Sequence, residues 1–141
     1  RKLTIPEGWT VAQIVSTIQQ IDCLEGDIKT LPREGSLLPE TYLYTYGEQR
    51  QALLDRMLKA MAAQLEELWL RRQSDDLIIK TPEMALILAS IVEKETGVDK
   101  ERARVASVFI NRLRLGMPLQ SDPTVIYALT LGKDSLERPL N

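Results

Sequence analysis

Apolar side chains recur along the chain at the spacing of amphipathic helices. The first such stripe has intervals of three and four residues, which place it on one face of a helix that packs against a core; its members are Val11, Ile14, Val15, Ile18 and Ile21. Thr10 precedes the stripe, and we expect its side chain to cap the helix. Before it, Lys2–Ile5 has the pattern of a short strand that Pro6 ends.

A longer amphipathic helix is predicted over Glu48–Arg72, where charged residues separate apolar positions at helical spacing. Gly26–Tyr46 before it is interrupted by Gly, Pro and aromatic residues, among them Tyr42. This composition is typical of an irregular loop with short extended pieces.

Three further helices are predicted in the second half of the chain. Thr81 and the proline that follows it start a helix over Pro82–Thr96, which ends at Gly97. Asp99–Leu115 follows, with Asp99 expected as the cap, and Thr124–Leu131 has the pattern of a short helix. The predicted fold is α+β and mainly α, with a small strand component, divided into residues 1–80 and 81–141.

Composition limits the possible chemistry. The chain has 141 residues, a formal net charge of −2 and a sequence pI near 5.3, which argues against nucleic acid as a partner. It has no histidine, and Cys23 is its single cysteine. Cys/His metal sites, His-based triads and internal disulfides are therefore excluded. Catalysis would have to use carboxylates, hydroxyls, amides, Lys or Arg, and we expect no metal and no organic cofactor.

Two carboxylates end a helix that is otherwise apolar. At 100° per residue Glu95 continues the stripe formed by Met84, Leu88 and Ile91, so we expect its carboxyl group to lie against aliphatic side chains. The usual pKa of a Glu carboxyl group is about 4.3, and the group must have a pKa about two higher to donate a proton near neutral pH. Such a rise means that the preference for the charged form falls by roughly 2.7 kcal/mol. Burial raises the pKa of a carboxyl group, and so does the negative end of the helix dipole.

A simpler interpretation is that both acids are solvated residues at a helix end. Glu93 and Glu95 would then pair with Lys94, Arg102 or Arg104. Glu93 also competes for the catalytic role, because it aligns with an apolar stripe of its own, and periodicity does not separate the two acids.

A second group of candidate residues surrounds a Gly-Met-Pro break. Short polar side chains of this kind hold sugar hydroxyls, and here they are Asn111, Gln120, Ser121, Asp122 and Thr124. Alternatively, Asp122 is only the cap of a helix that begins with Pro123, and Gln120 braces a turn.

Several motifs in this order resemble the YceG-like endolytic murein transglycosylases. They occur at Ile5–Gly8, Leu38–Tyr42, Ala89–Thr96, Val105–Leu113 and Gly116–Tyr127, and they cover nearly the whole chain. The resemblance implies a lysozyme-like helical catalytic core that is incomplete here at its C-terminus. In that family the catalytic acid is the Glu of a Glu-Thr pair, which corresponds to Glu95, and Glu93 matches the other acid of the motif.

The resemblance also implies a reaction and a location. The reaction is lytic cleavage of the MurNAc-GlcNAc bond with formation of 1,6-anhydroMurNAc, which terminates or trims nascent glycan strands and needs one carboxylate. We expect the glycan to contact Tyr42, Glu93, Asn111, Gln120, Asp122, Thr124 and Tyr127. Family members act at the periplasmic face of the bacterial inner membrane, with cell-wall synthases as possible partners. We expect any membrane anchor to lie before Arg1, and the sequence contains no complete LysM-like unit.

Three alternatives remain open at this point. Hydrolysis would use two acids, with Asp122 or Glu93 as the second. A glycan-binding or scaffold fragment would bind without turnover. A helix-turn-helix DNA binder is suggested by the two helices around Gly97, although the net charge opposes it.

Overall fold

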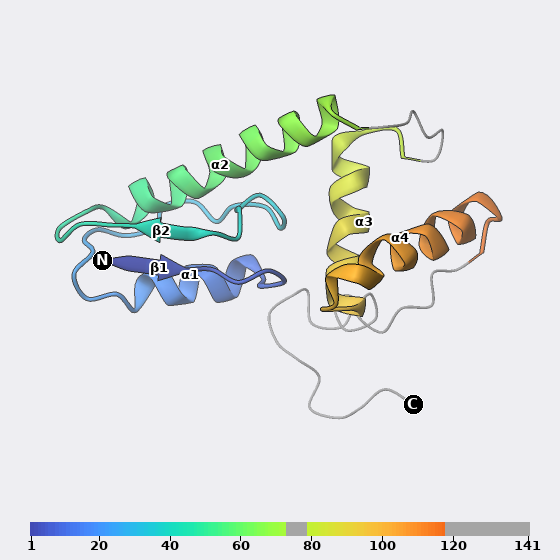
Figure 1. Cartoon of the computed structure of the whole chain (residues 1–141). Coiled ribbons are helices and arrows are strands. Elements are labelled where there is room, and N and C mark those ends of the chain that lie inside the picture. Colours follow the sequence, from blue (N-terminus) through green and yellow to red (C-terminus); the bar gives the residue numbers. More distant parts are fainter. Residues whose placement is uncertain (73–78, 118–141) are drawn as a thin grey trace. The chain divides into compact units, whose positions relative to one another are not determined.

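The computed structural model describes residues 1–72 and 79–117. The chain divides into two compact units, Arg1–Leu68 and Trp69–Asn141, which we call unit 1 and unit 2. The described residues are mainly helical with one two-stranded sheet (Figure 1), as predicted. The elements are β1 (Lys2–Thr4), α1 (Val11–Gln19), β2 (Thr41–Leu43), α2 (Arg50–Leu70), α3 (Pro82–Glu95) and α4 (Asp99–Arg114).

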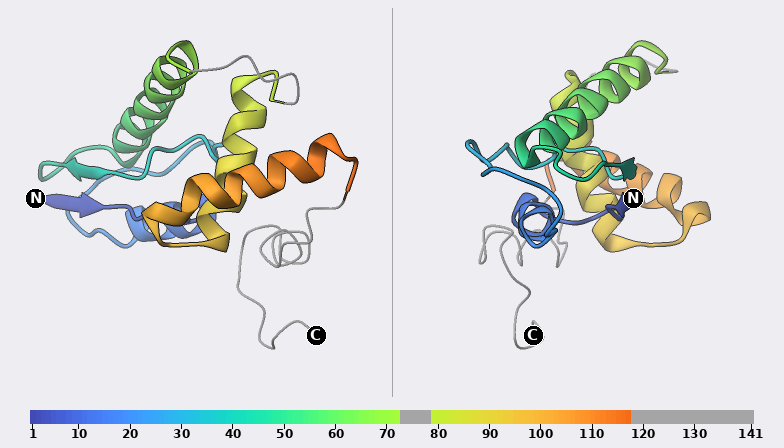
Figure 2. Two further views of the ribbon diagram at one scale, coloured as in Figure 1. Left: turned by 45° about the vertical axis from the view of Figure 1, so that its right-hand side comes forward. Right: turned by 90° about the vertical axis from the view of Figure 1, so that its left-hand side faces the viewer.

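The sheet in unit 1 pairs the N-terminal strand with an extended piece of the predicted loop. β1 and β2 are antiparallel, with Leu3 opposite Tyr42 and Thr4 opposite Thr41, and they run side by side in Figures 1 and 2. Just beyond the strands, the Ile5 amide donates to the Glu40 carbonyl at 3.0 Å. Side chains alternate across the sheet, so Tyr42 faces the core while Thr41 is exposed.

The core of unit 1 is formed by the sheet, α1 and the first half of α2. Its largest fully buried side chains are Ile5, Ile18, Leu53, Leu54 and Met57. The predicted stripe of α1 is confirmed, since four of its five members are buried, at Val11, Ile14, Val15 and Ile18, and Ile21 packs partly buried against them.

The start of α1 is capped as predicted. The Thr10 hydroxyl accepts from the Gln13 amide at 3.2 Å, and the Gln13 side chain accepts from the Thr10 amide at 2.8 Å. This reciprocal pair is a capping box, which satisfies two amides that lack partners within the helix. The Glu34 carboxylate satisfies a third amide at this helix end, because it accepts a hydrogen bond from the Val11 amide at 3.1 Å. Negative charge at this position also complements the helix dipole.

Arg50 connects the start of α2 to the end of α1. Its Nη2 donates to the Ile21 carbonyl at 2.8 Å and its Nη1 donates to the Gly26 carbonyl at 2.9 Å. Its Nε lies 3.4 Å from the Ile18 carbonyl. The planar guanidinium adds a donor to the Ile18 and Ile21 carbonyls, which also accept from backbone amides, and supplies one to the Gly26 carbonyl.

The second half of α2 differs from the prediction. The expected apolar stripe is buried only at Leu53, Leu54 and Met57, and farther along Leu68 and Leu70 are 56% and 73% exposed. The compact units divide within α2, between Leu68 and Trp69, whereas the sequence places the division at residue 80. Helical spacing identifies the helix, but it does not say how far along the helix a core extends.

In unit 2, α3 ends close to the start of α4, and α4 then turns away from it (Figures 1 and 2). The predicted cap of α3 is confirmed, because the Thr81 hydroxyl accepts from the Met84 amide at 3.2 Å and Pro82 is the first helical residue. The predicted cap of α4 is wrong. Val98 occupies that position without a side-chain bond, and Asp99 is the first residue of the helix.

Two further observations concern chemistry and membranes. Cys23 is a buried free thiol in unit 1, 7% exposed. None of the helices in residues 1–72 and 79–117 is both long and apolar enough to cross a bilayer.

Candidate active site at the end of α3

The last turn of α3 carries both predicted acids, and they differ in environment. Glu93 is half-buried, whereas Glu95, the last residue of the helix, is exposed. Of the apolar stripe predicted beside Glu95, Met84 is 39% exposed, whereas Leu88 and Ile91 are half-buried. Among the described residues Glu95 itself is not buried against them. Val92 is the buried residue of α3. Much of α3 is exposed in the described ranges because α4 is the element packed against it there, and one helix covers only one side of another.

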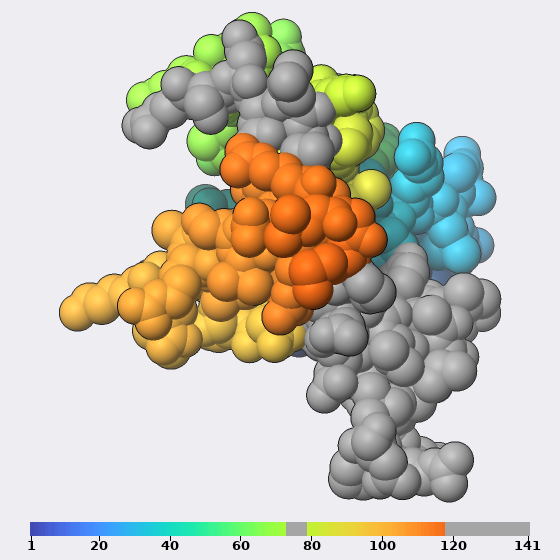
Figure 3. All heavy atoms as spheres, turned by 90° about the vertical axis from the view of Figure 1, so that its right-hand side faces the viewer, coloured from blue at the N-terminus to red at the C-terminus, as the bar shows by residue number. Residues whose placement is uncertain are grey.

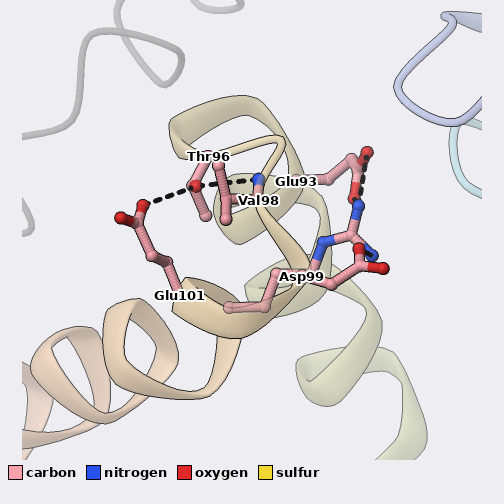
Figure 4. Close-up of polar contacts among 6 residues, drawn as sticks. Glu93, Thr96, Val98, Asp99 and Glu101 are labelled. Atoms are coloured by element: carbon pink, nitrogen blue, oxygen red, sulfur yellow. Dashed lines mark hydrogen bonds and ion pairs between the residues drawn. The ribbon is translucent and has the colours of Figure 1, made fainter.

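Glu93 is held by a guanidinium from α4. Arg102 Nη2 lies 3.1 Å from Glu93 Oε2 and 3.4 Å from Oε1. The same guanidinium reaches Asp99 through Nη1, at 2.8 Å from Oδ1. The sequence-based alternative that an acid at this helix end pairs with Arg102 is therefore confirmed for Glu93. Figure 4 shows Glu93 and Asp99 converging at this point.

The turn between the helices has a second set of polar contacts. The Thr96 hydroxyl accepts from the Val98 amide at 3.2 Å and donates to Glu101 Oε2 at 3.1 Å (Figure 4). Thr96 also closes α3, with its amide donating to the Val92 carbonyl at 3.1 Å. The hydroxyl therefore supplies the bond to the Val98 amide at the start of α4, where Val98 itself provides no side-chain cap.

The sequence-based prediction made Asp99 a helix cap and gave Glu101 no role; it included neither of the side-chain contacts that these residues make in this turn. A signal for one of them was present, because Asp99 and Arg102 are three residues apart, a spacing at which opposite charges meet on a helix. The Thr96 contact with Glu101 crosses a non-helical turn, so no helical periodicity could have indicated it.

Asn111 lies on α4 and is exposed. It is about three turns beyond Asp99, roughly 18 Å by the rise of an α-helix, so the described structure does not bring it together with Glu95. Much of the surface of α4 is open, as its orange atoms in Figure 3 show, and its exposed apolar side chains include Val108 and Leu113. The remaining second-half predictions lie outside the described residues, namely Gln120, Asp122, Thr124 and Tyr127.

Tyr42 has a structural position in unit 1. Its side chain is 8% exposed and packs in the core, and its hydroxyl donates to the Leu38 carbonyl. Burial raises the pKa of Tyr42 above its usual 10, with a smaller contribution in the same direction from Glu40 and an opposing one from Arg56. A ring in this position is part of the core of unit 1, and a contact between Tyr42 and glycan stays a prediction.

A metal site and a cavity are the two other kinds of candidate site. Residues 1–72 and 79–117 contain no group of three or more Cys, Asp or Glu side chains placed to hold a metal ion. A polar hollow of about 370 Å³ lies in unit 1 and contains none of the predicted site residues. Its lining consists of Gln19, Gly26, Asp27, Ile28 and Arg50.

Comparison with known proteins identifies the family. The YceG-like family matches residues 1–140, nearly the whole chain. The endolytic murein transglycosylase of Streptococcus pneumoniae serotype 2 is 32% identical over 165 aligned residues, covering 89% of this chain. The enzyme of the same name from Bacillus subtilis is 38% identical over 104 residues, covering 73% of this chain. The chain therefore belongs to the YceG-like family, as its sequence motifs predict.

A solved structure supports the same assignment. A yceG-like protein from Listeria monocytogenes matches 99% of this chain with a TM-score of 0.65 and 27% sequence identity. These proteins are longer than the chain described here. The chain spans 29% of the S. pneumoniae enzyme, 28% of the B. subtilis enzyme and 54% of the solved Listeria chain.

Proposed function

We propose that this chain carries the catalytic acid of an endolytic peptidoglycan lytic transglycosylase, and that the acid is Glu95. The names of its relatives support the reaction class. The observation that supports Glu95 over its neighbour is exposure. Glu95 is exposed at the end of α3, where a glycan can reach it, whereas Glu93 is half-buried and both of its oxygens face Arg102. Glu95 is also the Glu of the Glu-Thr pair that matches the catalytic motif of the family.

The reaction that we propose needs one carboxyl group. Glu95 in its acid form gives its proton to the glycosidic oxygen as the bond between that oxygen and C1 of MurNAc breaks. Positive charge develops on the sugar ring as an oxocarbenium-like centre. The C6 hydroxyl oxygen of the same MurNAc then bonds to C1 and passes its proton to Glu95. This step closes the 1,6-anhydro ring and restores the acid, and no water is consumed.

The proposal extends to the setting of the enzyme. Its substrate is a peptidoglycan glycan strand, which it terminates or trims at the periplasmic face of the inner membrane, close to cell-wall synthases. The other predicted contacts would line the cleft or hold its loop; they are Glu93, Asn111, Gln120, Asp122, Thr124, Tyr127 and Tyr42. Belonging to the YceG-like family supports this setting.

The test is digestion of purified peptidoglycan by the full-length protein that contains these residues. Wild type is compared with Glu95→Gln and with Glu93→Gln, and glycan ends are analysed by mass spectrometry. We expect anhydro ends from wild type, which are lighter than reducing ends by one water, and loss of cleavage in Glu95→Gln with its circular dichroism unchanged.

Three other results would contradict parts of the proposal. Full activity of Glu95→Gln combined with an inactive Glu93→Gln would assign the acid to Glu93. Reducing ends from wild type would indicate hydrolysis by two acids. Binding of glycan without any cleavage by wild type would favour a binding or scaffold protein.

A further inference from the structure

The corner between α3 and α4 is joined by the side chain of Arg102. Its two terminal nitrogens contact different carboxylates, Nη2 that of Glu93 at 3.1 Å and Nη1 that of Asp99 at 2.8 Å. Glu93 lies in the last turn of α3, and Asp99 is the first residue of α4. One planar group therefore ties the end of one helix to the start of the next.

Apolar packing at this corner is slight. In the described residues Val92 is the buried side chain of α3 and Phe109 that of α4, and Phe109 lies almost three turns into its helix. Val98, which sits in the turn itself, is 52% exposed. Within residues 79–117, the ion pair and hydrogen bonds of this corner therefore have a large share in fixing where the last turn of α3 lies.

Glu95 is placed between two residues that α4 holds. Two positions before it, Glu93 is held by Arg102; one position after it, Thr96 is held by Glu101 at 3.1 Å. The backbone that carries Glu95 is thus held on both sides, at Glu93 and at Thr96, which Figure 4 shows with their contacts.

We propose that Arg102 is a positioning residue for Glu95, fixing the last turn of α3 against α4 through Glu93 and Asp99. The proposal rests on the function proposed above, in which Glu95 is the acid. The side chains of Arg102 and Glu93 are 40% and 27% exposed, and ion pairs in such positions contribute little to stability. A small displacement of a catalytic group, in contrast, reduces the rate steeply. The effect of Arg102 should therefore be seen in turnover more than in folding.

The experiment measures kcat and KM for soluble glycan strands in the full-length protein. For Arg102→Ala we expect kcat to fall roughly 10- to 100-fold while KM stays within about twofold. Arg102→Lys should recover only part of the loss, because one ammonium cannot span both carboxylates. Arg104→Ala is the matched control on the same helix. Arg104 is exposed and has no ion pair within the described residues, so we expect the variant to have the kcat and KM of the wild type.

A double-mutant cycle separates positioning from a general loss of structure. If Arg102 acts through Glu93, the pair Glu93→Ala and Arg102→Ala should be no slower than Arg102→Ala alone. Independent, multiplicative losses would overturn the proposal. So would an Arg102→Ala variant with wild-type kcat while Glu95→Gln is inactive, a result that leaves the proposed function intact. An active Glu95→Gln would overturn the assignment of the acid, and with it the role of Arg102.

Discussion

The guanidinium of Arg50 donates to the Ile21 carbonyl at 2.8 Å, across an interval of 29 residues. The same group also reaches the Gly26 carbonyl, so a residue at the start of α2 organises the chain that leaves α1. A positive charge in the first turn of a helix is unfavourable to the dipole of that helix. The Ile18 carbonyl, which lies in the last turn of α1 and 3.4 Å from Arg50 Nε, offsets this effect because it belongs to the negative end of another helix dipole.

Replacing Arg50 should destabilise unit 1. We expect Arg50→Ala to lower the free energy of unfolding by about 2 kcal/mol, because three carbonyls lose a charged donor. The Ile18 and Ile21 carbonyls each keep a backbone donor. Arg50→Lys should retain less than half of the stability that Arg50→Ala loses, since a lysine lacks the forked guanidinium that reaches two carbonyls. Urea unfolding followed by Trp9 fluorescence, in a Trp69→Phe background, measures the change. Arg33→Ala, an exposed arginine of the same unit, is the control and should stay within about 0.5 kcal/mol of the parent.

Two methionines of α2 provide a matched test of where the core ends. Met57 is fully buried at 0% exposure, and Met61, one turn later on the same helix, is only half-buried. We expect Met57→Ala to cost about 2 to 4 kcal/mol and Met61→Ala less than about 1.5 kcal/mol. Urea unfolding of the two variants gives the comparison. Equal costs would show that the core continues along α2 beyond Met57.

Tyr42 should make the stability of unit 1 depend on alkaline pH. Its pKa is raised in the folded state, so the folded protein holds the phenol proton more tightly than the unfolded chain does. This contribution to stability is fully present below about pH 10 and is lost as the pH rises through the folded pKa. Tyr42→Phe lacks the contribution and the hydrogen bond to Leu38, so at pH 7 it should be about 1 kcal/mol less stable than the parent.

The measurement is unfolding in urea between pH 7 and 11. The stability difference between parent and Tyr42→Phe should narrow above about pH 10. Tyr46→Phe serves as the control, because Tyr46 is 79% exposed and should show no such trend. A difference for Tyr42→Phe that stays constant over the whole range would rule out the linkage.

The cap of α3 can be tested at a single amide. The Met84 amide donates to the Thr81 hydroxyl, and Thr81→Ala should destabilise the first turn by about 1 kcal/mol. Hydrogen exchange at Met84 should then be roughly five times faster, since that free energy corresponds to about this factor. Ser90→Ala removes a hydroxyl farther along the same helix, which donates to the Ile87 carbonyl, and should leave exchange at Met84 unchanged.

Local features of the fold could be read from the sequence, because each depends on neighbours in the chain. The caps Thr10 and Thr81 bond to amides three residues ahead, and the stripe of α1 depends on intervals of three and four. The cap of α4 was mispredicted for a local reason as well. Asp99 has the chemistry of a cap, but it lies one residue inside the helix, where its carboxylate meets Arg102.

Features that depend on what packs against a helix could not be read in this way. The apolar pattern of α3 predicted aliphatic surroundings for Glu95, yet Glu95 is exposed in the described residues, since a periodic pattern does not state how many partners a helix has. The bonds from Arg50 span up to 32 residues and follow from tertiary structure alone. At the site, the residues Glu93 and Glu95 came from the sequence, whereas their different environments came from the position of α4.

The buried thiol of Cys23 can report how often the structure around it opens. It is the single cysteine of the 141 residues, so any covalent label added by a thiol reagent marks one known atom. A side chain that is 7% exposed reacts when the structure around it opens, and the labelling rate then counts those openings. Fluctuations of the region around Cys23 can therefore be timed in this chain, without introducing a probe.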